Sequence, residues 1–170
     1  TNAWITNPYM NMAKPLELVL NSGCSLLTGE QLSEDRGELA DYPDYQSVYD
    51  AYLAELAKWI RVAIDIHSGI EERYKQDSPL PFLSANIGDC IEKARDFTDG
   101  GPRYNPSYAQ GTGISTAVDS LVVLKDLVFA QGTVDAAELL DALRHDFEGY
   151  SQLHTLLVNY PRKYGNDIDE

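Results

Sequence analysis

Residues 45–74 limit the possible folds more than any other part of this chain, because their hydrophobic side chains recur at steps of three and four residues. The series runs through Val48, Tyr52, Leu56, Trp59, Ile60, Ala63, Ile66, Ile70 and Tyr74. Such a period places all of these side chains on one face of an α-helix. Pro79 and Pro81 then disfavour helical geometry in the residue before each of them. We therefore predict one long helix over residues 45–74 and an extended segment over 78–83.

Shorter segments with the same period make the chain mostly α-helical. The predicted helices cover residues 10–21, 86–96, 114–130, 135–148 and 150–159. The other predicted elements are a loop over 24–44, a turn over 99–102, a short strand over 103–105 and a glycine-rich loop over 110–113. The predicted fold class is therefore mostly α with one or two short strands. For a chain of this length we expect a single domain over residues 1–170.

Capping residues mark the ends of some of these helices. Asn11 is the expected N-cap of the first helix, with Pro15 in its first turn, because a proline in a helix interior costs about 3 kcal/mol. Gly23 ends that helix, since glycine adopts the left-handed conformation that closes many helices. Thr133 and Asp135 are both candidates for the N-cap of the helix over 135–148.

Charge and composition exclude several classes of partner. The chain has 27 acidic and 13 basic residues, which gives a formal net charge of −14, so its surface repels a phosphate backbone and no nucleic acid partner is predicted. The longest apolar runs, such as residues 121–124, are far shorter than the roughly 20 residues of a membrane-spanning helix, so no membrane partner is predicted. Two cysteines are too few for a disulfide scaffold, which predicts a reducing compartment and a cytoplasmic location.

Two groups of motifs stand out in the second half of the chain. The first group is Gly-Gly-Pro-Arg-Tyr-Asn at residues 100–105, Gln-Gly-Thr-Gly-Ile at 110–114 and Val-Asp-Ser-Leu at 118–121; the second is Pro-Arg-Lys-Tyr-Gly-Asn-Asp at 161–167. In these motifs and their order the chain resembles the glycyl radical enzymes, which include pyruvate formate-lyase. The Gly-Gly-x-x-Tyr-Asn motif is similar to that of the glycerol and choline branch of the family.

This resemblance implies radical chemistry in a longer parent enzyme. In the family, a radical S-adenosylmethionine activating enzyme places a radical on a backbone glycine, which takes a hydrogen atom from a cysteine thiol. The thiyl radical then abstracts hydrogen from a small polar substrate, whose radical loses water, an amine, sulfite or a carbon fragment. The resemblance implies a fragment of a ten-stranded α/β barrel. Expected partners are the rest of the parent enzyme, the activating enzyme, a small-molecule substrate and further copies in a homo-oligomer.

The chain lacks the two motifs that carry this chemistry in the family. One is a cysteine in Gly-Cys-x-Glu, and the other is a glycine in Arg-Val-x-Gly-Tyr. We therefore expect an internal fragment that contains no catalytic residue, binds no cofactor directly and is inactive alone. Helices that lose the strands they pack on expose apolar surface, so we also expect the isolated chain to self-associate or to be marginally stable.

The resemblance places the loop over residues 4–9 beside the substrate. Thr6 and Tyr9 are therefore the predicted substrate-binding residues, and a purely structural loop is the alternative. Members of the glycerol dehydratase kind often carry a His-Asp pair about where Ile5 and Thr6 stand here. This difference argues against a vicinal diol as the substrate.

The two cysteines of the chain are predicted not to be catalytic. Cys90 and Glu92 have the Cys-x-Glu spacing of a thiyl radical site, but they precede the Gly-Gly turn, away from the catalytic position in the family. We predict a buried, unreactive thiol at Cys90. Cys24 lacks the glutamate two residues later, which rules it out by the same motif.

The remaining polar candidates have structural interpretations. His67, His145 and His154 are isolated in sequence, and neither His-x-x-x-His nor Cys-x-x-Cys occurs, so no metal site is predicted. Gly111 and Gly113 match neither dinucleotide nor P-loop spacing, which favours close backbone packing. Asp119 is expected on the turn that opens the helix over 114–130, in a capping or network role.

Three functional classes remain open at this stage. The first is a fragment of a glycyl radical lyase or dehydratase that cleaves a C–O, C–N, C–S or C–C bond. The second is a fragment of a formate C-acetyltransferase, which would have adjacent cysteines just upstream of Thr1. The third is a non-catalytic helical interaction module. The sequence of the gene on both sides of this segment distinguishes the three.

Overall fold

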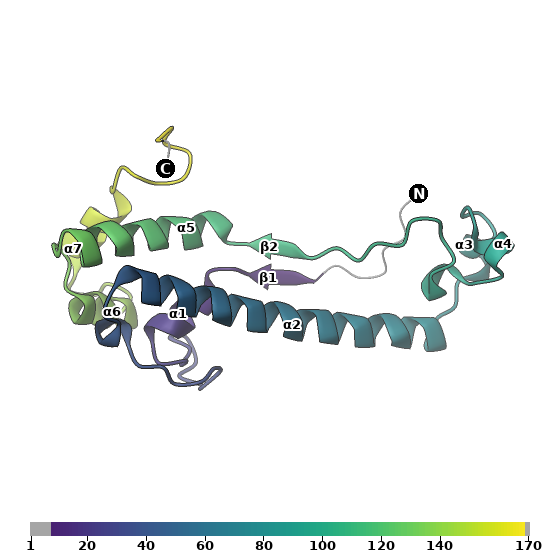
Figure 1. Ribbon diagram of the computed structural model, residues 1–170, viewed down its shortest axis with the longest axis horizontal. Helices are drawn as coiled ribbons and strands as arrows, with labels where there is room; N and C mark the ends of the chain where they lie inside the picture. The colour runs from purple at the N-terminus through teal and green to yellow at the C-terminus, as the bar shows by residue number, and fades with distance from the viewer. Residues whose placement is uncertain (1–7, 169–170) are drawn as a thin grey trace. The chain divides into compact units, whose positions relative to one another are not determined.

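The computed structural model describes residues 8–168, and within them the chain is mostly helical with two short strands (Figure 1), as the sequence predicts. The α-helices are α1 (Lys14–Leu20), α2 (Tyr45–Asp77), α3 (Pro81–Ser84), α4 (Cys90–Lys93), α5 (Ile114–Val123), α6 (Ala136–Arg144) and α7 (Ser151–Val158). The other elements are the strands β1 (Tyr9–Asn11) and β2 (Gln110–Thr112), the 3-10 turns η1 (Leu39–Asp41) and η2 (Phe97–Asp99), and the π-helical segment η3 (Leu124–Ala130).

The chain divides into two compact units. Unit 1 contains residues 8–10 and 58–111, and unit 2 contains residues 11–57 and 112–168. The long predicted helix is confirmed as α2, which contributes residues to both units. The Ser47 N–H donates to Asp44 Oδ1 at 2.8 Å, which satisfies one of the unpaired amides at the start of α2.

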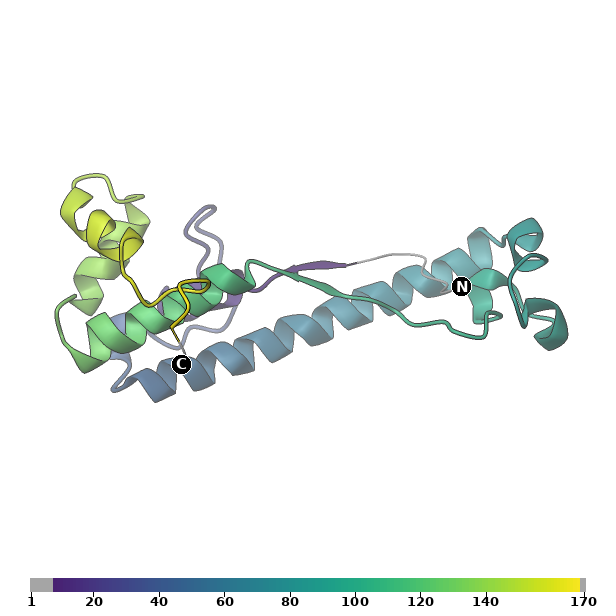
Figure 2. The ribbon, with the colours of Figure 1, turned by 90° about the horizontal axis from the view of Figure 1, so that it is seen from above.

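Unit 2 has a continuous hydrophobic core around the first turns of α2. Its buried members are Leu16, Val19, Leu20, Leu39, Val48, Tyr52, Ala117, Leu121, Val123, Leu124, Leu127, Val134 and Leu139. Most come from α1, α2, α5, η3 and α6, and Leu39 and Val134 come from η1 and from the loop before α6. These elements gather around the first turns of α2 in both ribbon views (Figure 2). The helix α5 continues directly into η3, so apolar side chains from one continuous helical segment, residues 114–130, pack on the core.

The start of the first helix differs from the prediction, although the role of its capping residue holds. The helix begins at Lys14, and Asn11 lies in β1. Asn11 Oδ1 still accepts hydrogen bonds from the backbone N–H groups of Ala13 and Lys14, at 3.0 and 3.2 Å. Pro15 lies in the first turn as predicted, where its missing N–H costs no intrahelical bond.

Several predictions for unit 1 were wrong in detail. Residues 81–83 are not extended, because Pro81 begins the one-turn helix α3; proline is favoured at the first helical position. The helix expected over 86–96 is reduced to α4, which is bounded by left-handed residues on both sides. The expected strand over 103–105 contributes a single bridge residue, and residues 110–112 form β2 where a loop was expected.

The helices after the π-helical segment follow the predictions closely. Asp135 is the N-cap of α6, with its side chain accepting from the Glu138 N–H at 2.9 Å, which resolves the choice between Thr133 and Asp135. The helix ends at Arg144, earlier than expected, and α7 ends before Pro161 as expected.

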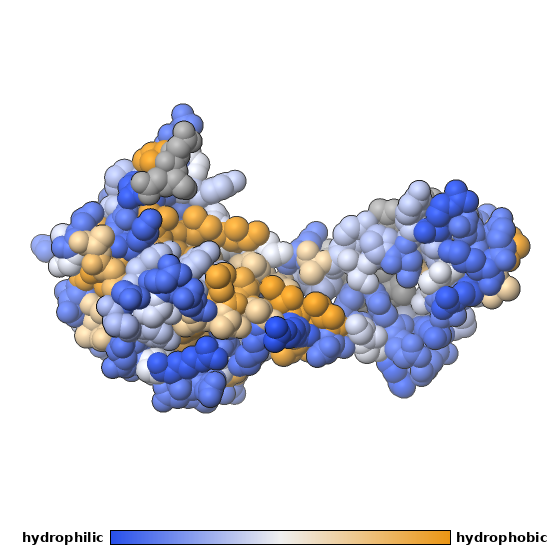
Figure 3. Space-filling view, in the orientation of Figure 1, coloured by the Kyte–Doolittle hydropathy of each residue, from blue (hydrophilic) through white to orange (hydrophobic). Residues whose placement is uncertain are grey.

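Many large hydrophobic side chains lie on the surface of each unit. In unit 1 the exposed set on α2 includes Val62, Ile64, Ile66, Ile70 and Tyr74. In unit 2 the exposed hydrophobic side chains include Ile114, Val118, Leu156, Val158 and Ile168. Hydrophobic side chains gather over α5 on the face drawn in Figure 3. Self-association of the isolated chain stays a prediction. Among residues 8–168, no helix combines the length and the apolar character that crossing a bilayer requires.

Candidate functional site

The Gly-Gly motif of unit 1 forms a turn into which no side chain fits. Gly100 has a φ of +70°, the left-handed conformation that favours glycine. A Cβ on Gly101 would lie 2.3 Å from Arg95 O, 2.8 Å from Asp96 O and 2.8 Å from Cys90 Sγ. Close packing of backbone on backbone therefore requires glycine at position 101.

Asp96 is the centre of the hydrogen bonds around this turn. Its carboxylate accepts from the Thr98 N–H at 2.9 Å, the Thr98 hydroxyl at 2.8 Å and the Ser84 hydroxyl at 2.7 Å. The Leu80 N–H lies 3.1 Å from each carboxylate oxygen. Partial burial raises the pKa of Asp96, but these hydrogen bonds outweigh it and lower the pKa to about 2. Asp96 thus ties α3 and η2 to the Gly-Gly turn.

Arg103, within the same motif, forms an ion pair that closes the turn. Its Nε and Nη2 lie 3.0 and 2.6 Å from Asp89 Oδ1. The hydrogen bond from Arg103 lowers the pKa of the Asp89 carboxyl, because it stabilises the charged form. The close backbone contacts at Gly101 and the ion pair between Arg103 and Asp89 therefore shape unit 1 around this motif.

The second motif, residues 161–167, contacts α5, which carries the Val-Asp-Ser-Leu motif, and the η3 segment that follows it. The Tyr164 N–H donates to Asp119 Oδ1 at 2.7 Å, and Arg162 Nη1 donates to Asp126 Oδ2 at 2.8 Å. Asp119 lies in the second turn of α5 and not on the opening turn, so the expected interaction with the helix N-terminus is wrong. Its network role is confirmed by the bond to Tyr164.

Tyr9, the predicted substrate contact, lies in the two-stranded sheet formed by β1 and β2. The side chain is 71% exposed. Backbone hydrogen bonds pair the strands: the Gln110 N–H donates to Pro8 O at 2.9 Å, and the Met12 N–H donates to Thr112 O at 2.8 Å. Thr6 lies outside the described residues. The structure therefore presents Tyr9 on an ordered strand with its ring accessible.

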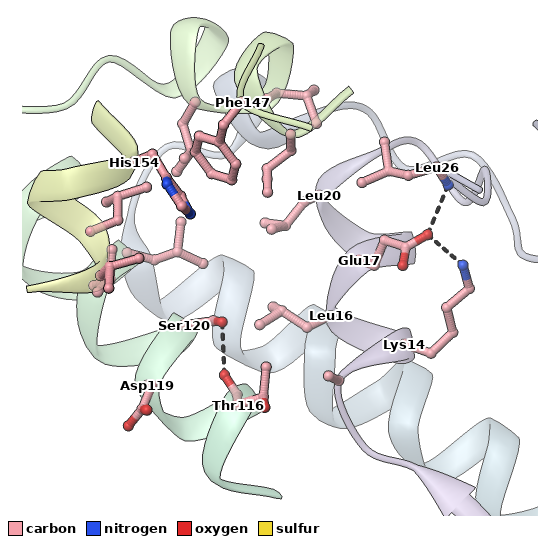
Figure 4. Close-up of a pocket in the computed structure, with 18 of the residues that line it drawn as sticks. Lys14, Leu16, Glu17, Leu20, Leu26, Thr116, Asp119, Ser120, Phe147 and His154 are labelled. Atoms are coloured by element: carbon pink, nitrogen blue, oxygen red, sulfur yellow. Dashed lines mark hydrogen bonds and ion pairs between the residues drawn. The ribbon is translucent and has the colours of Figure 1, made fainter. Parts of the chain in front are cut away.

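Unit 2 contains a pocket of about 540 Å³ among α1, α5, α6 and α7. Most of its lining is apolar. Leu16 and Leu20 line it from α1, and Phe147 and His154 line it on the other side (Figure 4). A second pocket of about 480 Å³ lies between α5 and residues 162–168. Lys163 contributes to the lining of both pockets.

A group of polar contacts marks the edge of the larger pocket. Glu17 Oε1 accepts hydrogen bonds from Lys14 Nζ and from the Leu26 N–H, the latter at 2.8 Å. Lys14 Nζ also donates to Ser25 Oγ at 2.9 Å. On α5, the Ser120 hydroxyl donates to Thr116 O at 2.7 Å. These polar groups bond to one another, which leaves the pocket wall largely hydrophobic (Figure 4).

The cysteines have the structural character that their motifs predict. Cys90 is 2% exposed, and burial raises the pKa of its thiol. The prediction of a buried thiol is confirmed, and a buried thiol with a raised pKa is expected to be a poor nucleophile. Cys24 is partly exposed, with its thiol 2.9 Å from Gln31 Oε1.

The histidines lie in separate places among the described residues. His67 on α2 is buried, with an exposed fraction of 7%, and its Nε2 lies 3.2 Å from Glu71 Oε1. The Ser107 hydroxyl donates to the same oxygen at 2.6 Å. His154 packs against Phe147, with ring centroids 4.8 Å apart. No group of three potential metal ligands occurs within residues 8–168.

Two residues of these networks were missed by sequence reasoning. Asp126 interrupts the apolar face of the helix over 114–130, and an acidic residue at a buried helical position signals a buried partner. Asp96 precedes Phe97 and Thr98 at the start of η2, where an aspartate is a common cap. Each signal can be recognised from neighbouring residues in the sequence. The residues that donate hydrogen bonds to these carboxylates could not be identified from those neighbours alone.

Comparisons with known proteins match the whole length of the chain. A family model described as pyruvate formate lyase-like matches residues 1–170. The trans-4-hydroxy-L-proline dehydratase of Clostridioides difficile is 38% identical over 167 residues, which are 98% of this chain and 21% of that protein. The (2S)-3-sulfopropanediol dehydratase of Klebsiella oxytoca is 34% identical over 98% of this chain and 20% of that protein.

A solved structure confirms the likeness in three dimensions. The crystal structure of hydroxyproline dehydratase from Clostridioides difficile, with trans-4-hydroxy-L-proline bound, superposes with a TM-score of 0.92 at 37% identity. The match covers 99% of this chain and 21% of that one. This chain therefore spans about a fifth of the length of the relatives it matches.

Proposed function

We propose, because this chain belongs to the pyruvate formate lyase-like family of glycyl radical enzymes, that it forms part of a longer glycyl radical lyase or dehydratase. Residues 1–170 would be an internal part of one pyruvate formate lyase-like domain. The observation that carries the proposal is the match of nearly the whole chain to one continuous fifth of such enzymes, with a TM-score of 0.92. The helices and the strand pair would then belong to a ten-stranded α/β barrel.

Elimination of water from a small polar substrate is the reaction that the comparisons favour. Two relatives at 38% and 34% identity are both named dehydratases. Of the C–O, C–N, C–S and C–C bonds that this chemistry can break, dehydration breaks a C–O bond. A glycyl radical in the parent enzyme would take a hydrogen atom from a cysteine thiol, and the resulting thiyl radical would abstract hydrogen from the substrate. Cys90 and Cys24 do not fit that thiol, so we assign it to polypeptide outside this chain.

The role proposed for this chain is to support and line the substrate cavity. Tyr9 and Thr6 are the proposed substrate contacts, and the ordered strand of Tyr9 supports this assignment. The exposed apolar residues of α2 and α5 support packing against the rest of the parent enzyme. The proposed partners are that remainder, a radical S-adenosylmethionine activating enzyme and further copies of the parent. The isolated chain is proposed to be inactive.

Radical formation tests this function. The intact protein that carries the chain is incubated without oxygen with an activating enzyme and S-adenosylmethionine, and electron paramagnetic resonance is recorded. We expect a glycyl radical doublet from the intact protein, followed by turnover of a hydroxylated substrate, and no signal from residues 1–170 alone. A silent intact protein, or a radical on the isolated chain, contradicts the proposal.

Loss of the Tyr9 hydroxyl should weaken transition-state binding. In the activated intact protein, Tyr9→Phe is expected to lower kcat/KM roughly 10-fold, the loss of one substrate hydrogen bond. Tyr104→Phe is the matched control, since Tyr104 is also exposed but lies on the Gly-Gly turn. Its kcat/KM should stay within about 2-fold, because surface changes have small effects. Equal effects of the two substitutions would show that Tyr9 does not contact the substrate.

A further inference from the structure

Asp126 is a buried acidic residue on the apolar face of a helix, and two donors to its carboxylate come from residues 160–167, the segment after α7. Its exposed fraction is 5%. Asp126 Oδ2 accepts from the Tyr160 hydroxyl at 2.5 Å and from Arg162 Nη1 at 2.8 Å. The hydrogen bond to Asp126 raises the pKa of Tyr160, because it stabilises the protonated phenol. Such donors are what make a buried carboxylate tolerable.

The helix that carries Asp126 changes its geometry at this point. Asp126 lies in η3, where the Gln131 N–H donates to Asp126 O, five residues back, at 2.9 Å. Asp119 lies seven residues earlier, close to two helical turns, so both carboxylates meet the same segment. Asp119 Oδ1 accepts the Tyr164 N–H at 2.7 Å. Figure 2 shows this segment running back along α5 after α7.

The segment is held at every second residue and is also bonded within itself. Its hydrogen bonds to Asp119 and Asp126 come from Tyr160, Arg162 and Tyr164. Inside it, the Lys163 N–H donates to Pro161 O at 3.0 Å, and the Asn166 N–H donates to Lys163 O at 3.1 Å. The Asn166 side chain also donates to Pro161 O, at 2.8 Å. Lys163, which lies between Arg162 and Tyr164, lines both pockets of unit 2.

We infer that Asp126 and Asp119 are positioning residues that hold residues 160–167 in one conformation against α5 and η3. Asp126 acts through Tyr160 and Arg162, and Asp119 acts on the backbone of Tyr164. Lys163 thereby becomes a fixed part of the wall that the two pockets share. The Val-Asp-Ser-Leu motif at 118–121 and the motif at 161–167 are then one conformational unit within unit 2. This inference does not depend on the proposed radical chemistry.

Hydrogen exchange in the intact protein tests the inference directly. Arg162→Gln replaces the charged donor, whose side chain is partly exposed, and leaves the buried Asp126 carboxylate in place. We expect amides of residues 160–167 to exchange roughly 10-fold to 100-fold faster, the range for losing a hydrogen bond to a charged group. Amides of α1 and α2 should exchange as before. Arg162→Lys should restore part of the protection, since it keeps the charge but not the planar donor.

Lys163→Gln is the matched control, because it removes the same charge from the next residue. Lys163 Nζ donates to Val158 O at an exposed position, so exchange across residues 160–167 should change little. Asp119→Ala should accelerate the Tyr164 amide, whereas Asp119→Asn keeps an acceptor oxygen there and should not. Unchanged exchange in both Arg162→Gln and Asp119→Ala overturns the inference. Faster exchange throughout unit 2 also overturns the inference, because it would mean that the substitutions lower the stability of the whole unit and not the order of residues 160–167 in particular.

Discussion

Gly101→Ala is expected to prevent the Gly-Gly turn from forming and to unfold the part of unit 1 around it. The added Cβ would lie 2.3 Å from Arg95 O, and that oxygen belongs to backbone that cannot rotate away. The Cys90 thiol and Asp96 O, both at 2.8 Å, block the other directions. We expect a loss of about 4 kcal/mol or more in the free energy of unfolding, in the range reserved for severe core disruption.

Thermal unfolding and hydrogen exchange across residues 78–105 measure this effect. Gly69→Ala is the matched control, because Gly69 lies within α2 and a Cβ added there would meet no atom of the described residues within 4 Å. Alanine there should stabilise the helix by about 0.5–1 kcal/mol, since glycine loses more backbone entropy on folding. If Gly101→Ala unfolds at the wild-type temperature with unchanged exchange, the close packing assigned to this turn is wrong.

Acid is expected to weaken unit 1 through Asp96. The folded pKa of about 2 is below the ordinary value of 3.8, so the unfolded chain takes up the proton first as pH falls. The stability that Asp96 contributes is therefore complete above about pH 4 and is lost as pH falls towards about 2. The difference amounts to about 1–2 kcal/mol once solvent screening of a partly exposed group is allowed for.

Asp96→Asn tests this pH dependence in urea unfolding curves. Near neutral pH the variant should lose about 2 kcal/mol, because the amide has one accepting oxygen where Asp96 uses both carboxylate oxygens, and its NH2 group cannot accept the remaining hydrogen bonds. Below about pH 3 the difference from wild type should shrink towards zero. Asp65→Asn, with the same change of charge on the exposed face of α2, should show little effect at either pH. A deficit for Asp96→Asn that is constant with pH would contradict the role given to its charge.

The positions of the helices could be predicted from sequence because helix formation depends on residues a few positions apart. The long α2, the first-turn place of Pro15 and the restriction of the α6 cap to Thr133 or Asp135 all follow from such local signals. Short elements were predicted less well. Strands β1 and β2 have three residues each, which is too short to show a period of two. Pro81 was read as a helix breaker, although proline also begins helices.

The sequence by itself determined the helical character, the ends of several helices and, through two groups of motifs, the family. The tertiary structure alone decided which faces are buried and which carboxylates are paired. Along α2 one hydrophobic period includes buried Val48 and exposed Ile66, because burial depends on which elements pack against each turn. Asp126 meets Arg162 across 36 positions. A separation of that size leaves no local pattern, so only the folded chain shows that the two residues are partners.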